Sequence, residues 1–523
     1  MTEACVIIGA GPAAAAAARA LVAGGRTATI LNAGVPGSLS PPPPVEGSFA
    51  QWRSTSPSQW KDLVGEDFAA LRENRISPKF SVPRYARILG AHGGAAIATD
   101  NFHLASTDVL GGLSVAWGAG VARFDEADLR DWPLSYPDLE PFYRDEAEAM
   151  GIGGRIADDL SDYFGEALQV GAPSDLAPIA EAVLARYEKS KARVGFRMGR
   201  ARNALLSEAR DGREPCQNLG SCLFGCRLGA IYSAEDDLRR LVGRRAVRLV
   251  EDFRVDRLER DGDNWRIVGG ASSGAPRELS ARRVILAAGA VGSLLIVLRS
   301  SSPTREPLQL LSSPTGAFAV VDPRRVGAAT TSAGNALAAL GLVLDEDDDR
   351  VYAGLFTTDG LLRSSVICRL NVGRVPGRLV ARALLPAMLV GNVFFSGKYA
   401  RNRVTFSATG LQISGGLDDR LPELARRVQR RLASGLLRLG LVMAPGGIEL
   451  AAPGADVHYA GTLAHAARPT GLQTSVSGAL EALPGVFVAD GSVLPSLPAK
   501  SHTLTIMANA RRIATALAGA ADW

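Results

Sequence analysis

The first fourteen residues place the strongest constraint on how this chain can fold. The apolar residues 4–8 lead into Gly9-Ala10-Gly11-Pro12-Ala13-Ala14, and an alanine-rich run follows. A short apolar run is typical of a buried parallel strand. Gly9 permits a tight turn, Gly11 lets the backbone approach a phosphate, and Ala14 still allows a helix to pack closely on the strand. We therefore expect a strand–turn–helix unit whose helix N-terminus binds a dinucleotide.

The expected second strand, Thr27–Leu31, ends at Asn32 and Ala33. Folds of this kind usually carry an acidic residue here, which binds the ribose hydroxyls. Asn32 can accept a hydrogen bond through its amide oxygen but carries no charge. No arginine stands in place to bind a 2′-phosphate, so the segment does not indicate NADP. A nucleotide fold that has lost its nucleotide is the alternative.

Composition narrows the function without naming it. The chain has 523 residues, 47% hydrophobic and 21% charged, with a formal net charge of +5, which suits a globular protein of two domains. Basic and acidic residues are interspersed, so we expect no nucleic-acid partner. Five cysteines are an odd number, which argues against a secreted disulfide scaffold. With no basic segment before the alanine-rich run, we expect no signal peptide and a cytoplasmic protein.

Two histidines near the other end of the chain lie in motifs of their own. These are His458-Tyr459-Ala460-Gly461-Thr462 and Ser501-His502-Thr503-Leu504-Thr505, with Asp490-Gly491 between them. Histidine moves protons near neutral pH because its ordinary pKa lies there. Thr503 and Leu504 begin an expected last helix, whose N-terminus carries a positive dipole end.

Two further segments carry glycine-marked signals. The loop Gly111–Gly120 reads GGLSVAWGAG and would bring backbone N–H groups close to a flat ligand. The run Arg283–Ala290 reads RVILAAGA and, with Val291-Gly292-Ser293, predicts a second strand–glycine–helix unit.

Taken in order, these motifs resemble the glucose–methanol–choline (GMC) family of flavin-dependent alcohol oxidoreductases. The resemblance implies FAD as cofactor and an alcohol or sugar-like substrate, whose CH–OH group loses a hydride to flavin N5. His458 would be the base and His502 would orient the oxygen; the electron acceptor would be oxygen or another carrier. The resemblance implies these cofactor-binding residues: Gly9, Gly11, Pro12, Ala13, Ala14, Asn32, Ala33, Gly111, Gly112, Ser114, Trp117, Gly118, Val255, Ala288, Gly289, Asp490, Gly491, Thr503 and Leu504. The chain departs from the family at Ala119 and at Leu463–Ala466.

The resemblance also implies an α/β fold. It combines a discontinuous Rossmann-type FAD-binding domain with an α+β substrate-binding domain built on an antiparallel sheet. The predicted domains are residues 1–35, 95–125, 200–300 and 455–523 for FAD; 126–199 and 301–454 for the substrate; and 36–94 for lid and cofactor-covering loops.

Several alternatives stay open. A redox-neutral lyase or cyclase on the same fold is the alternative function. Cys216, Cys222 and Cys226 either form a structural loop or, as in cluster-bearing relatives, ligate iron–sulfur; we expect no other metal site. The segment 374–403 is either a buried hairpin or an apolar tip with a basic collar that rests on an anionic membrane. The remaining histidines His92, His103 and His465 are expected to be core or surface residues.

Overall fold

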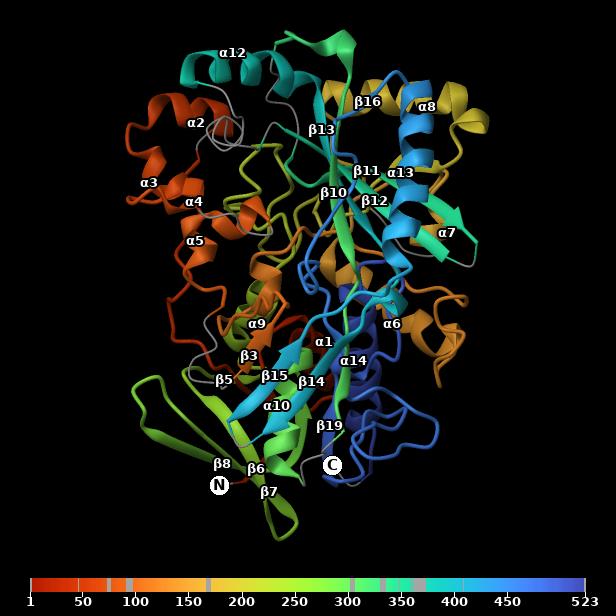
Figure 1. The fold of residues 1–523 in the computed structure, drawn as a ribbon. Coiled ribbons are helices and arrows are strands. Elements are labelled where there is room, and N and C mark those ends of the chain that lie inside the picture. The colour runs from red at the N-terminus through yellow and green to blue at the C-terminus, as the bar shows by residue number, and fades with distance from the viewer. Residues whose placement is uncertain are drawn as a thin grey trace.

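A computed structural model gives the arrangement of the chain in space (Figure 1). It describes residues 2–45, 47–72, 77–90, 97–165, 171–301, 306–329, 335–347, 349–358, 360, 373–407 and 409–521. His92 and Cys368 lie outside these residues. One sheet occupies the lower part of the molecule in Figure 1, and an antiparallel sheet occupies the upper part. We call them the floor sheet and the roof sheet.

The floor sheet has a parallel core. Its strands, in spatial order, are β5 (Arg248–Val250), β2 (Thr29–Leu31), β1 (Thr2–Ile8), β8 (Pro276–Leu286), β7 (Asn264–Gly270) and β6 (Arg254–Asp261), and β19 (Val486–Val488) pairs with the end of β8. Ile7 of β1 pairs with Ile30 and with Ile285, all three fully buried. Burial on both faces explains the apolar run at residues 4–8, and this part of the sequence prediction is confirmed.

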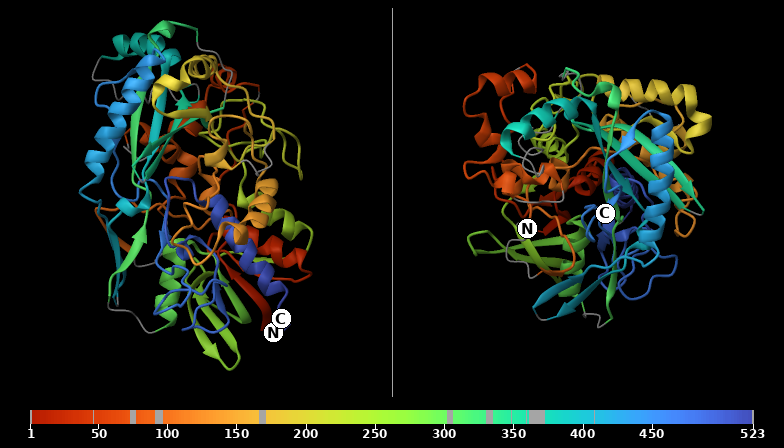
Figure 2. Two further views of the ribbon diagram at one scale, coloured as in Figure 1. Left: turned by 90° about the vertical axis from the view of Figure 1, so that its right-hand side faces the viewer. Right: turned by 45° about the horizontal axis from the view of Figure 1, so that its top comes forward.

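Helices cover this sheet and bring the two chain ends together. They are α1 (Pro12–Ala23), α6 (Tyr136–Met150), α9 (Ala234–Gly243), α10 (Gly289–Ser300) and α14 (Thr503–Ala518). Helix α1 packs on α14, and its alanines Ala13–Ala18 are buried. Small side chains allow this close approach: a Cβ on Gly24 would lie 2.6 Å from the Cβ of Ala518. Both termini therefore lie at the same end of the molecule (Figure 2).

The roof sheet is antiparallel. Its strands are β16 (Val442–Met443), β10 (Thr315–Val321), β13 (Met388–Phe394), β12 (Asp349–Thr357), β11 (Ala338–Glu346) and β4 (Arg197–Arg200), with β17 (Glu449–Leu450) also on β10. Helices α8 (Pro178–Val194) and α13 (Leu421–Arg438) pack on one face. Helix α13 buries Leu424, Val428, Leu432 and Leu436, one residue per turn. The opposite face of the sheet is left for a cavity.

A third sheet joins the two regions. It contains β18 (Ala460–Gly461), β9 (Leu308–Leu311), β14 (Asn402–Ser407), β15 (Gly410–Ser414) and β3 (Ile97–Asp100). The other helices are α2 (Phe49–Thr55), α3 (Gln59–Val64), α4 (Ala69–Arg72), α5 (Pro83–Ala86), α7 (Ser161–Phe164) and α12 (Arg374–Leu384). Short 3-10 helices occur at η1 (Pro78–Ser81), η2 (Gly112–Val115), η3 (Pro323–Arg325), η4 (Leu385–Ala387), η5 (Gly397–Tyr399) and η6 (Gly491–Val493).

The expected fold class is confirmed, since a parallel nucleotide-type sheet and an antiparallel sheet are both present. The proposed domain limits stay a prediction. Helix α6 falls within the range assigned to the substrate domain, yet its Leu139, Tyr143 and Ala147 belong to the core of the floor region.

The structure divides the apolar run Ala381–Phe395 between the end of α12, η4 and β13. Strand β13 lies inside the roof sheet between β10 and β12, so this part is a buried central strand and not a surface tip. On its C-terminal flank Lys398 pairs with Asp349 and Arg401 with Asp418, whereas Arg378 and Arg382 on α12 are exposed. Membrane contact through the segment 374–403 stays a prediction. In the described part of the chain, no helix combines the length and apolar character that crossing a membrane requires.

Candidate active site

A cavity of about 720 Å³ lies between the floor and roof regions. Segments from both chain ends line it, including Gly9–Ala13 and the stretch Ser501–Thr503. The face of the roof sheet opposite α8 and α13 closes it, and β10, β12 and β13 each contribute lining residues. The site thus requires the chain to bring together residues that are nearly five hundred positions apart.

The turn after β1 is shaped by two glycines with different tasks. Gly9 has a φ of +110°, and a Cβ there would lie 2.3 Å from the carbonyl oxygen of Ala287, so only glycine fits between the two crossing turns. Gly11 meets nothing within 4 Å on its Cβ side and borders the cavity. Ala14 is fully buried and faces the core instead. Gly11 therefore leaves room for a ligand, whereas Gly9 and Ala14 serve packing.

Asn32 ends β2 at the edge of the cavity. Its backbone bonds to Val250 and Phe253, which fixes its position. Its side chain is buried, and the amide nitrogen has no hydrogen-bond partner among the described residues. A buried unpartnered donor is costly unless a ligand satisfies it. Asn32 is thus poised to donate, whereas its sequence position suggested an acceptor.

The glycine-rich loop combines open space with internal bonds. A Cβ on Gly118 would meet nothing within 4 Å, and this residue borders the cavity. The Ser114 hydroxyl donates to the carbonyl of Gly111 and accepts from the backbone of Ala234, at 2.6 and 3.0 Å. Trp117 donates from its indole to the Tyr232 carbonyl at 2.9 Å. The side chains of this loop hold its shape and leave its backbone facing the cavity.

Asp490 fastens the start of α10 to η6. Its Oδ2 accepts hydrogen bonds from the Gly289 backbone and the Ser293 hydroxyl, and its Oδ1 from the backbone and hydroxyl of Ser492. Burial raises the pKa of this carboxyl. Because all four bonds go to the protein, the side chain organises the loop and leaves the backbone of Gly491 at the cavity wall.

His458 and His502 lie side by side in the cavity wall, with ring centroids 4.9 Å apart and ring planes at 67°. His458 also stacks on Phe394 of the roof, at 5.2 Å and 23°. The Nδ1 atoms of both histidines are buried and have no hydrogen-bond partner among the described residues. Burial lowers the pKa of His458 to about 4, and burial with the charge of His458 takes the pKa of His502 well below its ordinary value. Both rings are therefore neutral bases near pH 7.

The other described histidines are different. His465 is buried and bonded on both sides, by Nδ1 to the Thr474 hydroxyl at 2.9 Å and by Nε2 to the Asn509 amide at 3.0 Å. His103 is exposed. The expectation of ordinary core and surface roles is confirmed for these two, and the paired site uses only His458 and His502.

Asp456 is a site residue that the sequence reasoning missed. Its Oδ2 accepts from the backbone of Ser313 at 2.7 Å and of His458 at 3.1 Å, so it pins the histidine loop to the segment after β9. It borders the cavity, and burial raises the pKa of its carboxyl to about 7. An acidic residue two positions before the histidine was the available signal.

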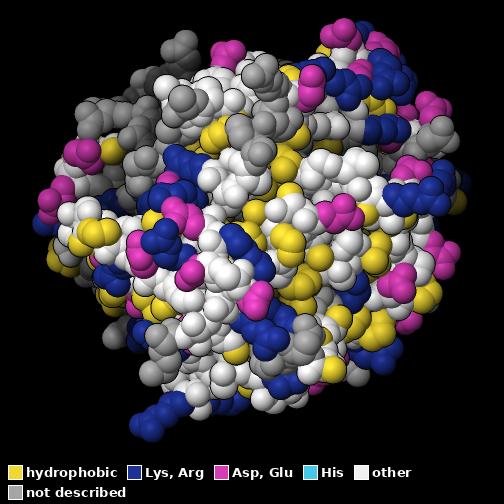
Figure 3. Space-filling model, turned by 90° about the horizontal axis from the view of Figure 1, so that it is seen from below, with side chains coloured by type: hydrophobic (Ala, Val, Ile, Leu, Met, Phe, Trp, Pro, Cys, Tyr) yellow, Lys and Arg dark blue, Asp and Glu magenta, His cyan; other side chains and the backbone are white. Residues whose placement is uncertain are grey.

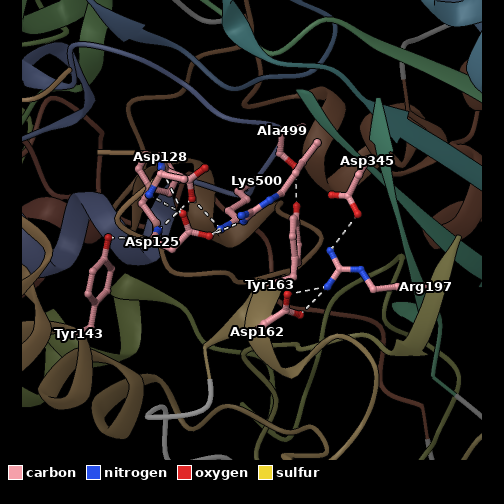
Figure 4. Close-up of polar contacts among 12 residues, drawn as sticks. Asp125, Asp128, Tyr143, Asp162, Tyr163, Arg197, Asp345, Ala499 and Lys500 are labelled. Carbon is pink, nitrogen blue, oxygen red and sulfur yellow. Dashed lines mark hydrogen bonds and ion pairs between the residues drawn. The ribbon is translucent and has the colours of Figure 1, made fainter. Parts of the chain in front are cut away.

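A buried ion cluster surrounds Lys500, two residues before His502 (Figure 4). The ammonium of Lys500 bonds to Asp125 at 2.9 Å and to Asp128 at 2.6 Å, and Arg350 of β12 pairs with Asp125 as well. Lys500 also lies over the ring of Tyr163, at 4.8 Å from its centroid. Since Lys500 is two residues before His502 and Arg350 belongs to the roof, the cluster couples the two regions at the histidines.

The three cysteines of the cysteine loop are not gathered into a metal-binding group among the described residues. Cys216, Cys222 and Cys226 are free thiols, and only Cys222 borders the cavity. Burial raises the pKa of the Cys222 thiol to about 12, so the thiolate form that binds iron is disfavoured. Across the described ranges, no group of three or more His, Cys, Asp or Glu side chains is arranged to hold a metal ion. The iron–sulfur alternative remains a prediction for iron analysis.

Comparisons with known proteins bear on the fold. No protein-family model matches the chain. Over 208 residues the chain is 23% identical to a 2-methyl-1,2-propanediol dehydrogenase of Mycolicibacterium austroafricanum. That match covers 37% of this chain and 36% of the dehydrogenase, about a third of the relative's length. The crystal structure of pyridoxine 4-oxidase from Mesorbium loti matches 98% of both chains, with a TM-score of 0.62 and 15% identity. The chain has the fold of the GMC oxidoreductases.

Most residues predicted for a GMC-type cofactor site border the cavity. They are Gly9, Gly11, Pro12, Ala13, Asn32, Ala33, Gly112, Ser114, Trp117, Gly118, Ala288, Gly289, Asp490, Gly491 and Thr503. Four do not: Ala14, Gly111, Val255 and Leu504. Val255 pairs with Gly269 in the β6–β7 ladder. The residue of this region that contacts Asn32 is Phe253, whose backbone N–H donates to the Asn32 carbonyl.

The lining of this cavity fits FAD. Gly11, Gly118 and Gly289 all have open space where a Cβ would stand, as a flat cofactor with a pyrophosphate requires. Helices α1 and α14 both begin at the cavity, so their N-terminal N–H groups favour anionic groups there. The unpartnered amide of Asn32 adds a donor at the end of β2.

Proposed function

We propose that this protein is an FAD-dependent oxidoreductase that oxidises a CH–OH group of a small-molecule alcohol or sugar-like substrate to a carbonyl. One observation carries the proposal: two neutral imidazoles, each with a buried Nδ1 that has no partner among the described residues, lie in the wall of the same cavity as the nucleotide-type glycine turns. The two named relatives, an oxidase and a dehydrogenase, are oxidoreductases named for hydroxyl-bearing compounds, which supports the same class.

The chain's own residues account for the proton chemistry. An alcohol hydroxyl placed between the rings donates its proton to His458, which is neutral because burial lowers its pKa. His502 holds the alcohol oxygen from the second side and keeps the carbon oriented. FAD, when bound, supplies the acceptor for the hydride that leaves the same carbon. The residues that would hold it are the turn Gly9–Ala13, the loop at Gly118, and the turn at Gly289 that is bonded to Asp490.

The test is the visible absorption spectrum of the purified protein, followed by anaerobic mixing with a panel of alcohols and sugars. We expect a flavin spectrum that bleaches with at least one compound. A flavin that no alcohol bleaches would contradict the net oxidation and favour the redox-neutral lyase or cyclase. A colourless protein that does not take up FAD would contradict the cofactor assignment. Repeating the mixing in air distinguishes oxygen from another carrier as electron acceptor.

The cytoplasmic location and the lack of a nucleic-acid partner belong to the same proposal. On the face shown in Figure 3, basic and acidic side chains are interspersed and do not gather by sign, which supports the second point for that face. Binding to a nonspecific duplex at low salt, measured by fluorescence anisotropy, tests it.

Peripheral contact with an anionic membrane is a further part of the proposal, and it now rests on α12. Val375 and Leu379, one turn apart, have exposed fractions of 70% and 65%. Arg378 and Arg382, also one turn apart, are exposed and have no ion-pair partner among the described residues. The helix has no acidic residue. An apolar stripe beside a basic stripe suits an anionic lipid surface.

Cosedimentation with phosphatidylglycerol vesicles, against phosphatidylcholine vesicles, tests this contact. The double variant Val375→Ser, Leu379→Ser should lose binding, whereas Leu437→Ser, with an exposed fraction of 63% on α13, should keep it. Equal sedimentation of all three proteins, or none with either lipid, would remove α12 as a membrane site.

A further inference from the structure

The roof above the histidines has a notch with one polar side chain. The strand register places Ala317 and Gly354 on either side of Asn392. In this cross-strand row Asn392 has a long side chain, whereas Ala317 has only a methyl group and Gly354 has no side chain. All three residues border the cavity. The two neighbouring cross-strand rows have larger side chains, because Phe394 lies opposite Tyr352 and Phe356 lies opposite Val390.

The amide of Asn392 is held in one orientation. Its Oδ1 accepts from the backbone N–H of Gly354 at 3.1 Å. A Cβ on residue 354 would lie 2.8 Å from this oxygen, so the glycine makes room for the amide. The amide nitrogen has no acceptor among the described residues, although the side chain is at the cavity wall. A fixed, unused donor in a mostly apolar wall is a feature of ligand recognition.

The place of Asn392 relative to the histidines sets the size of the ligand. Phe394, which stacks on His458, is two residues farther along the same face of β13. Two residues of a strand span about 7 Å. A ligand that reaches both Asn392 and the histidine pair must therefore extend over at least a ring and the carbon that bears the hydroxyl group. The cavity-lining residues of β10, β12 and β13 include no charged side chain, so the ligand in this notch is neutral.

We propose that Asn392 selects the substrate of this site, donating its amide N–H to an acceptor atom of an uncharged, ring-bearing alcohol whose ring lies among Phe394, Tyr352 and Phe356. This inference rests on the proposed alcohol oxidation and names its substrate class. Asn392 acts on binding and orientation, while the proton chemistry stays with the histidines.

The first test compares benzyl alcohol with 4-pyridylmethanol, which differ by a ring nitrogen in place of a C–H group. The wild-type holoprotein should be reduced anaerobically about fivefold more efficiently by the pyridyl alcohol, the value of one neutral hydrogen bond. Asn392→Leu keeps the size of the side chain but removes the donor, so the ratio of the two efficiencies should fall close to one. Gly354→Ala should bring the ratio close to one, because its Cβ displaces the amide.

Val390→Ala is the matched control, since it trims the neighbouring row without touching a polar group. It should change the rates with both alcohols by the same factor and keep their ratio. Equal efficiency of the two alcohols with the wild type, or an unchanged ratio in Asn392→Leu, would overturn the inference.

A binding experiment separates this inference from the proposed reaction. Toluene and 4-methylpyridine have no hydroxyl group, so the proposed reaction cannot oxidise them. Their dissociation constants are measured by titrating the oxidised protein and following the change in its flavin spectrum. Tighter binding of 4-methylpyridine than of toluene in the wild type but not in Asn392→Leu would support the donor even if no alcohol reduces the flavin. Reduction by both alcohols with no difference would leave the reaction standing and overturn the role of Asn392.

Discussion

The floor and the roof enclose one cavity by different means. The floor meets it with turns, where Gly11, Gly118 and Gly289 leave backbone exposed and space open. The roof meets it with side chains that alternate along β10, β12 and β13, such as Phe394 and Asn392. A backbone turn recognises what all nucleotides share, whereas a sheet face can change one side chain at a time. We infer that the floor fixes the cofactor and the roof the substrate, with the histidines between.

The largest effect is expected where the two regions meet. His458→Ala removes the proposed proton acceptor and should lower the rate of anaerobic flavin reduction by about 10³-fold, within the range for general-base catalysis. FAD content should stay as in the wild type, because the histidine is not part of the floor. Stopped-flow absorbance at the flavin band measures both quantities. The exposed His103→Ala serves as control and should change neither; a wild-type rate in His458→Ala would refute the assignment.

The second prediction separates the floor from the roof. A Cβ at Gly11 would enter the open space of the cavity, so Gly11→Ala should weaken FAD binding by at least about tenfold through steric overlap. Gly243→Ala is matched to it, because a Cβ there also meets nothing within 4 Å but points away from the cavity. The flavin-to-protein absorbance ratio, before and after added FAD, measures the difference. Full flavin content in Gly11→Ala would remove this turn from the cofactor site.

The third prediction concerns the connection between the regions. Lys500→Met leaves Asp128 buried without its cation and should lower the free energy of unfolding by about 3 kcal/mol. It should also slow flavin reduction, since the loop before His502 loses its anchor. Lys61→Met breaks a solvent-exposed pair with Glu66 at 2.8 Å and should leave the free energy of unfolding nearly unchanged. Urea unfolding measures both, and equal losses would show that the cluster has no special role.

The smallest effect is one of pH. Burial lowers the pKa of His458 to about 4 and of His465 to about 3, both below the unfolded value of about 6.5. The unfolded chain therefore takes up protons first as the pH falls, so this stability is present above pH 6.5 and is lost as the pH drops through the folded pKa values. Activity should likewise persist below pH 6.5 and decline near pH 4. A decline of kcat/KM that begins at pH 6.5 would contradict this. In Asp456→Asn the decline near pH 4 should remain, because it reflects His458 and not Asp456.

Residue type and local spacing by themselves determined the turns of the floor. Gly9, Gly11, His458 and His502 stand in contiguous motifs, because a turn or a helix start is decided within a few residues. The cofactor contact of Val255 stays a prediction, since its place depends on the β6–β7 ladder and not on its neighbours in sequence.

Only the tertiary structure decided the rest of the site. No motif of their own marks Asp456, Lys500 and Asn392. Their partners Ser313, Asp125 and Gly354 are distant in the chain, and only the folded structure brings each pair into contact. The apolar run of β13 is compatible with a surface tip or a buried strand, and its pairing with β10 and β12 decides between the two. Hydrophobic patterning fixes which residues are buried, but packing fixes which ones meet, and the specificity of this cavity depends on the latter.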